Sequence, residues 1–181
     1  MQKTVLSFLV FLMLNWNANS QTNYNKQILK EAHLYANSIK KHHFKEVVAH
    51  IYPALVEKLG GKDSMYVKTS NKMVLLKKEG LRYKSIEFGE LSKIINTDAN
   101  LWYAVLPQTI TQINSQGKIV TETFLFVIST NQGKTWFFIE EEQFHNHKKT
   151  LFKKMKMELE LPERNQCFIK NKGFTSFNKP N

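Results

Sequence analysis

The hydrophobic pattern of this chain changes its period at Gly80, and this change restricts the fold more than any other feature of the sequence. Before Gly80 the apolar residues recur every three or four positions, which indicates amphipathic helices. After Gly80 they form runs rich in aromatic and β-branched residues between short polar turns, which indicates strands. Helices followed by strands predict an α+β fold, with N-terminal helices packed on one face of a curved antiparallel sheet.

Three helices are expected in the first part of the chain. The first runs from Tyr24 to His43, and the second runs from Phe44 to Leu59 with a break or kink at Pro53. The third runs from Ser64 to about Glu79, with Asp63 as its N-cap.

The strands expected after these helices cover residues 81–95 with an interruption near Gly89, 101–114, 118–130 and 135–141. The last three of them form a predicted meander. Its middle, Phe124 to Ile128, is apolar at every position, which is typical of a strand covered on both faces. We expect the helices to cover one face and a second subunit, in a homodimer, to cover the other. A closing helix is expected from His145 to Met157, and a weakly structured tail from Leu161 onward.

Residues 1–20 have the three parts of a secretory signal peptide. Lys3 supplies the positive charge, Val5 to Leu14 are apolar, and small residues, Ala18 and Ser20, precede the expected cleavage site. An apolar run of this length is too short to span a bilayer, which takes about 20 residues. No cysteine follows the run, so a lipoprotein anchor is not expected. We therefore expect a soluble, exported protein, periplasmic or secreted; the alternative is a buried N-terminal helix.

The composition excludes several classes of protein. A chain of 181 residues, 42% of them hydrophobic, can form one core and is too short for two ordinary domains. The single cysteine, Cys167, excludes an intramolecular disulfide framework, and we expect it to be an inert, half-buried thiol. The net charge is +11, yet Arg82 and Arg164 are the only arginines. Because nucleic-acid recognition usually relies on bidentate arginine, no nucleic-acid partner is expected.

Three stretches carry a resemblance to a known fold family. They read Tyr52-Pro53-x-Leu55-Val56-x-x-x-Gly60-Gly61-Lys62, Glu79-Gly80, and Ser129-x-Asn131-x-Gly133-Lys134-Thr135-Trp136-x-Phe138-Ile139. With the order of helices and strands, they resemble the nuclear-transport-factor-2-like, cone-shaped α+β superfamily, which includes SnoaL-like and ketosteroid-isomerase-like proteins. More closely, the chain resembles a family of uncharacterised exported bacterial proteins with that fold. The resemblance covers roughly residues 24–142 and implies a domain at 21–145, followed by a basic C-terminal helix and tail at 146–181. The superfamily includes enzymes, carriers and non-catalytic members, so the fold implies no single function.

The stretch from Ser129 to Trp136 also fits the Asp-box pattern of sialidase-like propellers, with Asn131 at the Asp position. A propeller needs at least four repeated blades, and this sequence has one copy of the motif. We therefore interpret it as a structural hairpin, in which Asn131 caps the turn, Gly133 takes a positive φ and Trp136 anchors the turn.

One carboxylate, Glu122, lies among apolar residues of a long strand. If it faces the concave side of the sheet, burial would raise its pKa and suit it as the general base of an isomerase or dehydratase; if it faces outward, it is a surface residue. Four aromatic residues are candidates for lining a pocket, although aromatic residues in such positions are more often simply core: Tyr35, Tyr52, Trp102 and Tyr103.

Histidines provide the only arrangements in the sequence that suggest a metal. His42-His43 would point to different faces of a helix, and no cysteine or aspartate completes a set around His145-x-His147. Glu140 to Glu142 precede that pair and could contribute oxygen ligands. We favour solvated histidines, and expect neither a metal nor another cofactor.

A basic cluster follows these histidines and consists of Lys148, Lys149, Lys153, Lys154 and Lys156. It could rest on an anionic envelope surface, or its helix could dock apolar residues on the core and leave the lysines in water.

The sequence therefore favours a non-catalytic, exported module that binds a small apolar ligand or a partner. A small isomerase or dehydratase using Glu122 or a histidine in the cone, and a protein associated with the envelope surface, remain alternatives.

Overall fold

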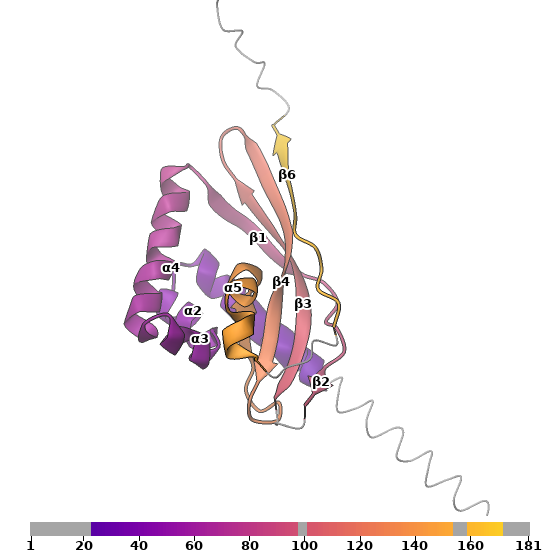
Figure 1. The fold of residues 1–181 in the computed structure, drawn as a ribbon. Helices are drawn as coiled ribbons and strands as arrows, with labels where there is room; N and C mark the ends of the chain where they lie inside the picture. The colour runs from indigo at the N-terminus through magenta and orange to yellow at the C-terminus, as the bar shows by residue number, and fades with distance from the viewer. Residues whose placement is uncertain (1–22, 98–100, 154–158, 172–181) are drawn as a thin grey trace, which may run out of the picture.

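The computed structural model describes residues 23–97, 101–153 and 159–171. Helices come first in this part of the chain, and a six-stranded antiparallel sheet follows them, so the predicted α+β class is confirmed (Figure 1). The predicted signal peptide at 1–20, the end of the predicted closing helix, Lys154 and Lys156 lie outside the described residues.

The helices that precede the sheet are a helix at residues 23–40, here called the N-terminal helix, α2 (Phe44–His50), α3 (Pro53–Lys58) and α4 (Gly61–Lys78). The predicted break at Pro53 is confirmed. Pro53 is the first residue of α3, where its missing N–H leaves no helical hydrogen bond unmade. The prediction that Asp63 caps the third helix is wrong. Gly60 is the N-cap, with φ of 101°, and Asp63 lies in the first turn, where a negative charge is favourable.

The strands are β1 (Arg82–Phe88), β2 (Ile95–Asn96), β3 (Trp102–Ile113), β4 (Gly117–Ser129), β5 (Phe137–Glu140) and β6 (Asn165–Lys170). They lie in the order β1-β3-β4-β5, with β2 paired to β3 and β6 paired to β4. β3 and β4 pair along their whole length, from Trp102 opposite Ser129 to Ile113 opposite Lys118. The predicted meander of β3, β4 and β5 is therefore confirmed.

The prediction of a weakly structured tail is wrong for β6. This strand pairs with residues Gly117 to Glu122 of β4, on the edge that β5 occupies further along. All six of its side chains are exposed, so backbone hydrogen bonds rather than burial hold it in place. A strand of this kind leaves no alternating apolar pattern in the sequence. Cys167 belongs to β6 and is exposed, so the prediction of a half-buried thiol is wrong.

The apolar run of β4 is fully buried, and the prediction that both of its faces are covered is confirmed. The N-terminal helix packs on the face that carries Leu125 and Val127. The helix α5 (Glu141–Leu151) packs on the face that carries Phe124 and Phe126 (Figure 1). Because the same chain supplies both covers, this run gives no reason to expect a second subunit at the sheet.

The hairpin between β4 and β5 has the predicted structural role. The Oδ1 atom of Asn131 accepts hydrogen bonds from the N–H of Thr135 and the hydroxyl of Ser129, both at 2.9 Å. Gly133 has a φ of 79°, and its N–H donates to Ser129 Oγ at 3.0 Å. Trp136 is 2% exposed, in the core below the turn.

Among the described residues, no helix combines the length and the apolar character needed to cross a bilayer.

Candidate functional site

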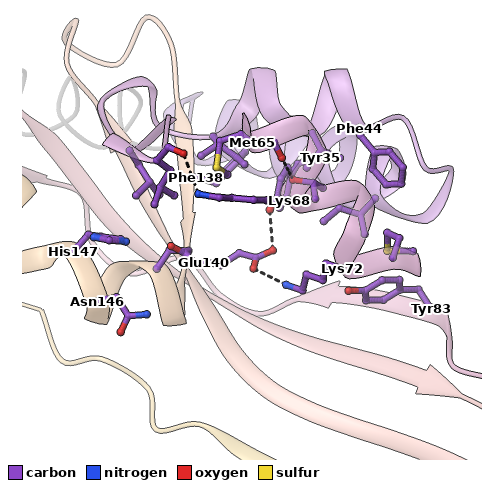
Figure 2. Close-up of a pocket in the computed structure, with 18 residues that line it drawn as sticks. Tyr35, Phe44, Met65, Lys68, Lys72, Tyr83, Phe138, Glu140, Asn146 and His147 are labelled. Carbon is purple, nitrogen blue, oxygen red and sulfur yellow. Dashed lines mark hydrogen bonds and ion pairs between the residues drawn. The ribbon is translucent and has the colours of Figure 1, made fainter. Parts of the chain in front are cut away.

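A cavity of about 420 Å³ lies between the helices and the face of the sheet that the N-terminal helix covers (Figure 2). The N-terminal helix, α2, α3, α4, β5 and α5 all contribute to its walls. Much of the lining is apolar and includes Phe44, Val47, Ile51, Leu55, Met65 and Phe138. Val47, Leu55 and Phe138 are at most 2% exposed, so the wall continues directly into the core.

One end of the cavity carries an ion pair between α4 and β5. Lys72 Nζ lies 2.9 Å from Glu140 Oε2, and the hydroxyl of Tyr35 donates to Glu140 Oε1 at 3.1 Å. Glu140 reaches the cavity because alternate residues of a strand share a face, so its side chain lies on the same face as that of Phe138. Figure 2 shows the three polar groups converging from three separate elements.

The pKa values of Lys72, Glu140 and Tyr35 all depart from their ordinary values. The positive charge of Lys72 holds the pKa of Glu140 below its ordinary value of 4.5, and the charge of Glu140 raises the pKa of Lys72. Burial raises the pKa of Tyr35 well above its ordinary value, and the Glu140 charge adds to this effect. Both members of the pair therefore stay charged at neutral pH. They are surrounded by protein but reach water through the cavity, because 55% of the Lys72 side chain and 37% of the Glu140 side chain remain accessible.

A second lysine, Lys68, lies one helical turn before Lys72 on α4 and also lines the cavity. Its Nζ donates to the backbone carbonyl of Leu59 at 3.0 Å. Asn146 and His147 reach the cavity from α5 (Figure 2). The cavity thus combines apolar walls with cationic, amide and imidazole groups.

A smaller cavity of about 220 Å³ adjoins the first and shares five of its lining residues: Tyr35, Ile39, Lys72, Tyr83 and Glu140. It extends over polar residues of β3 and β4, including Gln108 and Thr123. Glu141 also lines it, accepts a hydrogen bond from the hydroxyl of Thr123, and lies 4.0 Å from Arg164 Nη1. The Lys72–Glu140 pair therefore lies between the larger cavity, which has apolar walls, and the smaller cavity, which extends over polar residues.

Of the four aromatic candidates, only Tyr35 lies at the cavity. Tyr52 stacks on Phe152 with ring centroids 5.9 Å apart. Trp102 packs edge-on against Tyr24 at 5.2 Å. Tyr103 is fully buried on the face of the sheet that α5 covers, so it is a core residue.

Glu122 is exposed. It lies opposite Thr109 in the sheet, and Asn165 Nδ2 donates to its Oε2 at 3.4 Å. The structure therefore agrees with the second alternative stated for Glu122, in which its side chain faces outward as a surface residue.

The residues that sequence reasoning missed are Lys72 and Glu140. Glu140 was considered only as one of three acidic residues near histidines. Its alternation with Phe138 along β5 was the signal that could have placed it on the apolar face. Lys72 is one of five lysines on α4, and no local pattern distinguishes it.

His33, His42, His43 and His145 are exposed, whereas His50 and His147 are half-buried. His145 Nε2 lies 3.9 Å from Glu141 Oε1, and the side chains of Lys148, Lys149 and Lys153 are exposed. In the part of the chain that the structure describes, no three His, Cys, Asp or Glu residues are grouped so that they could hold a metal ion.

No protein-family model matches this chain, and neither a curated protein nor a solved structure is significantly similar to it.

Proposed function

We propose that this protein is an exported, non-catalytic module that binds a small, largely apolar ligand in the 420 Å³ cavity. The observation that carries the proposal is the cavity itself, with its apolar walls and a few polar groups at one end. Small-molecule sites have volumes of roughly 300–1,000 Å³ and this combination of apolar lining and few orienting polar groups.

We also propose that the domain has the cone-shaped, nuclear-transport-factor-2-like fold. The order of helices before a meander of long strands supports this assignment. So does the position of the cavity between the helices and the sheet, where a cone of this kind would be open.

The ionisation of the site favours binding over catalysis. A carboxylate that acts as a general base at neutral pH needs a raised pKa, and the pKa of Glu140 is lowered by Lys72. Both oxygens of Glu140 already accept hydrogen bonds, from Lys72 and Tyr35. The exposed Glu122 lies outside the cavity. These groups are therefore suited to orienting a ligand rather than to removing a proton from it.

Two tryptophan substitutions on α4 test whether the cavity is the binding site. Thr69 is half-buried and lines the cavity, whereas Val67 is 53% exposed and does not line it. We expect the wild type and Val67→Trp to enhance the fluorescence of Nile red equally, and Thr69→Trp to lose the enhancement because its indole fills the space. Unchanged Nile red binding by a folded Thr69→Trp protein would contradict the proposal.

Native mass spectrometry of residues 21–181, purified gently from an exporting host, then addresses the natural ligand. A non-covalent adduct of one definite mass that is missing from Thr69→Trp would identify the ligand class.

A further inference from the structure

We infer that the cavity selects an amphiphile with a single negative charge, whose anionic group binds Lys68 and whose hydrocarbon body lies along the apolar walls. This inference rests on the proposed function and goes further, because it names the chemical class of the ligand.

The positive charges that line the cavity outnumber the negative ones. Glu140 neutralises Lys72 at 2.9 Å. Lys68 forms no ion pair with any residue that the structure describes, and its one hydrogen bond goes to the carbonyl of Leu59. An ammonium group has three donors, so two donors of Lys68 remain for a ligand. Among the lysine, arginine and acidic side chains described in the lining, two positive charges and one negative charge leave one positive charge uncompensated.

The position of Lys68 suits an anionic headgroup. Lys68 lines the largely apolar cavity, and Figure 2 draws its side chain between the labelled Met65 and Glu140. Lys68 is exposed, which lets the headgroup keep contact with water while the hydrocarbon body is buried. A lysine commonly divides its surface in this way between its aliphatic stem and its charged head.

The same arrangement disfavours two other ligand classes. A cationic amphiphile would approach two ammonium groups. Glu140, the one carboxylate among the described lining residues, already has both oxygens occupied by Lys72 and Tyr35. A doubly charged phosphate monoester would require a second free cation, and Lys72 is already paired. A carboxylate amphiphile needs only the one cation that is free.

Three probes with the same hydrocarbon chain test the inference: dodecanoate, dodecanol and dodecylammonium, which are anionic, neutral and cationic. Each competes with Nile red on the full mature chain at low ionic strength. We expect dodecanoate to bind most tightly and dodecylammonium most weakly. Lys68→Gln should weaken dodecanoate about tenfold, the low end of the range for a charge-assisted hydrogen bond at an exposed site, and leave dodecanol unchanged.

Lys62→Gln is the matched control, because this substitution removes the same charge as Lys68→Gln. Lys62 is exposed on α4 and does not line the cavity. Equal weakening of dodecanoate by both variants would assign the preference to the net charge of the chain and overturn the inference. So would equal binding of dodecanoate and dodecanol to the wild type, or tightest binding of dodecylammonium. These three outcomes concern only the charge preference, so the proposal that the cavity binds a small apolar ligand would remain. If none of the three probes displaced Nile red, the proposed function would fall as well.

Discussion

The Lys72–Glu140 pair should contribute a small, measurable coupling to stability. At 2.9 Å, two unit charges in water attract by about 1.4 kcal/mol, and burial would strengthen this attraction. Both side chains are more than a third accessible, so screening and lost side-chain entropy act against it. We therefore expect a coupling energy of about 0.5–1 kcal/mol at pH 7.

A double-mutant cycle measures this coupling. The free energy of urea unfolding is compared for the wild type, Glu140→Gln, Lys72→Met and the double variant. In the control cycle Lys78→Met replaces Lys72→Met, because Lys78 lies on the same helix and forms no ion pair with Glu140. This control cycle should give no coupling.

The coupling should also depend on pH with a definite sign. The pKa of Glu140 is lower in the folded protein than its ordinary value of 4.5, so its contribution is complete above that value. The contribution is lost as the pH falls through the folded pKa. The pKa of Lys72 is raised above 10.5, so the contribution persists at neutral pH and is lost only in strong alkali. A coupling at pH 7 within about 0.3 kcal/mol of zero, or one that grows on acidification, would refute this reasoning.

Four further outcomes are expected. Phe126→Ala should lower the free energy of urea unfolding by about 3–5 kcal/mol, because its ring is fully buried in the core; a loss below about 1 kcal/mol would contradict the packing. Asn131→Ala removes an oxygen that accepts two hydrogen bonds and should cost about 1–2 kcal/mol in the same assay. The exposed Cys167 should react with a thiol reagent in the folded protein as fast as in urea, and Cys167→Ser should change stability by no more than about 0.5 kcal/mol. Glu122→Gln should leave both stability and Nile red binding unchanged, because the side chain is exposed; a loss of binding would place Glu122 in the site after all.

The features that the sequence predicted correctly are those with local causes. A proline within a helical pattern breaks the helix there, and α2 and α3 are separated at Pro53. The hairpin from Ser129 to Trp136 carries its own capping residue and its own glycine with positive φ. The uniformly apolar run of β4 correctly indicated two covered faces.

What the sequence did not predict depends on contacts between distant parts of the chain. Periodicity indicates that a face is covered but not by which segment, and α5 took the place that we expected a second subunit to take. The sequence did not predict β6, because hydrogen bonding to β4 rather than side-chain burial places this strand in the sheet.

The candidate site shows the same limit. Tyr35 was named from its residue type, and composition could not separate it from Tyr103, which is core. Lys72 and Glu140 are 68 positions apart in the sequence, and only the packing of α4 beside β5 brings their charges to 2.9 Å. A charged pair of this kind leaves no local signature, because each member alone looks like a solvated surface residue.

The way the core is closed strengthens the assignment of a ligand site. The N-terminal helix and α5 cover the two faces of the sheet, and their side chains complete two packed clusters within this chain. The apolar wall of the cavity continues from both clusters, because Val47 and Phe138 belong to one of them and Leu55 belongs to the other. The cavity is lined by residues of α2, α3, α4 and β5, among others, and it has an ion pair at one end. Apolar walls favour an apolar occupant, and the fixed charges at one end would orient it. The occupant that satisfies both conditions is a molecule with a hydrocarbon body and one polar group.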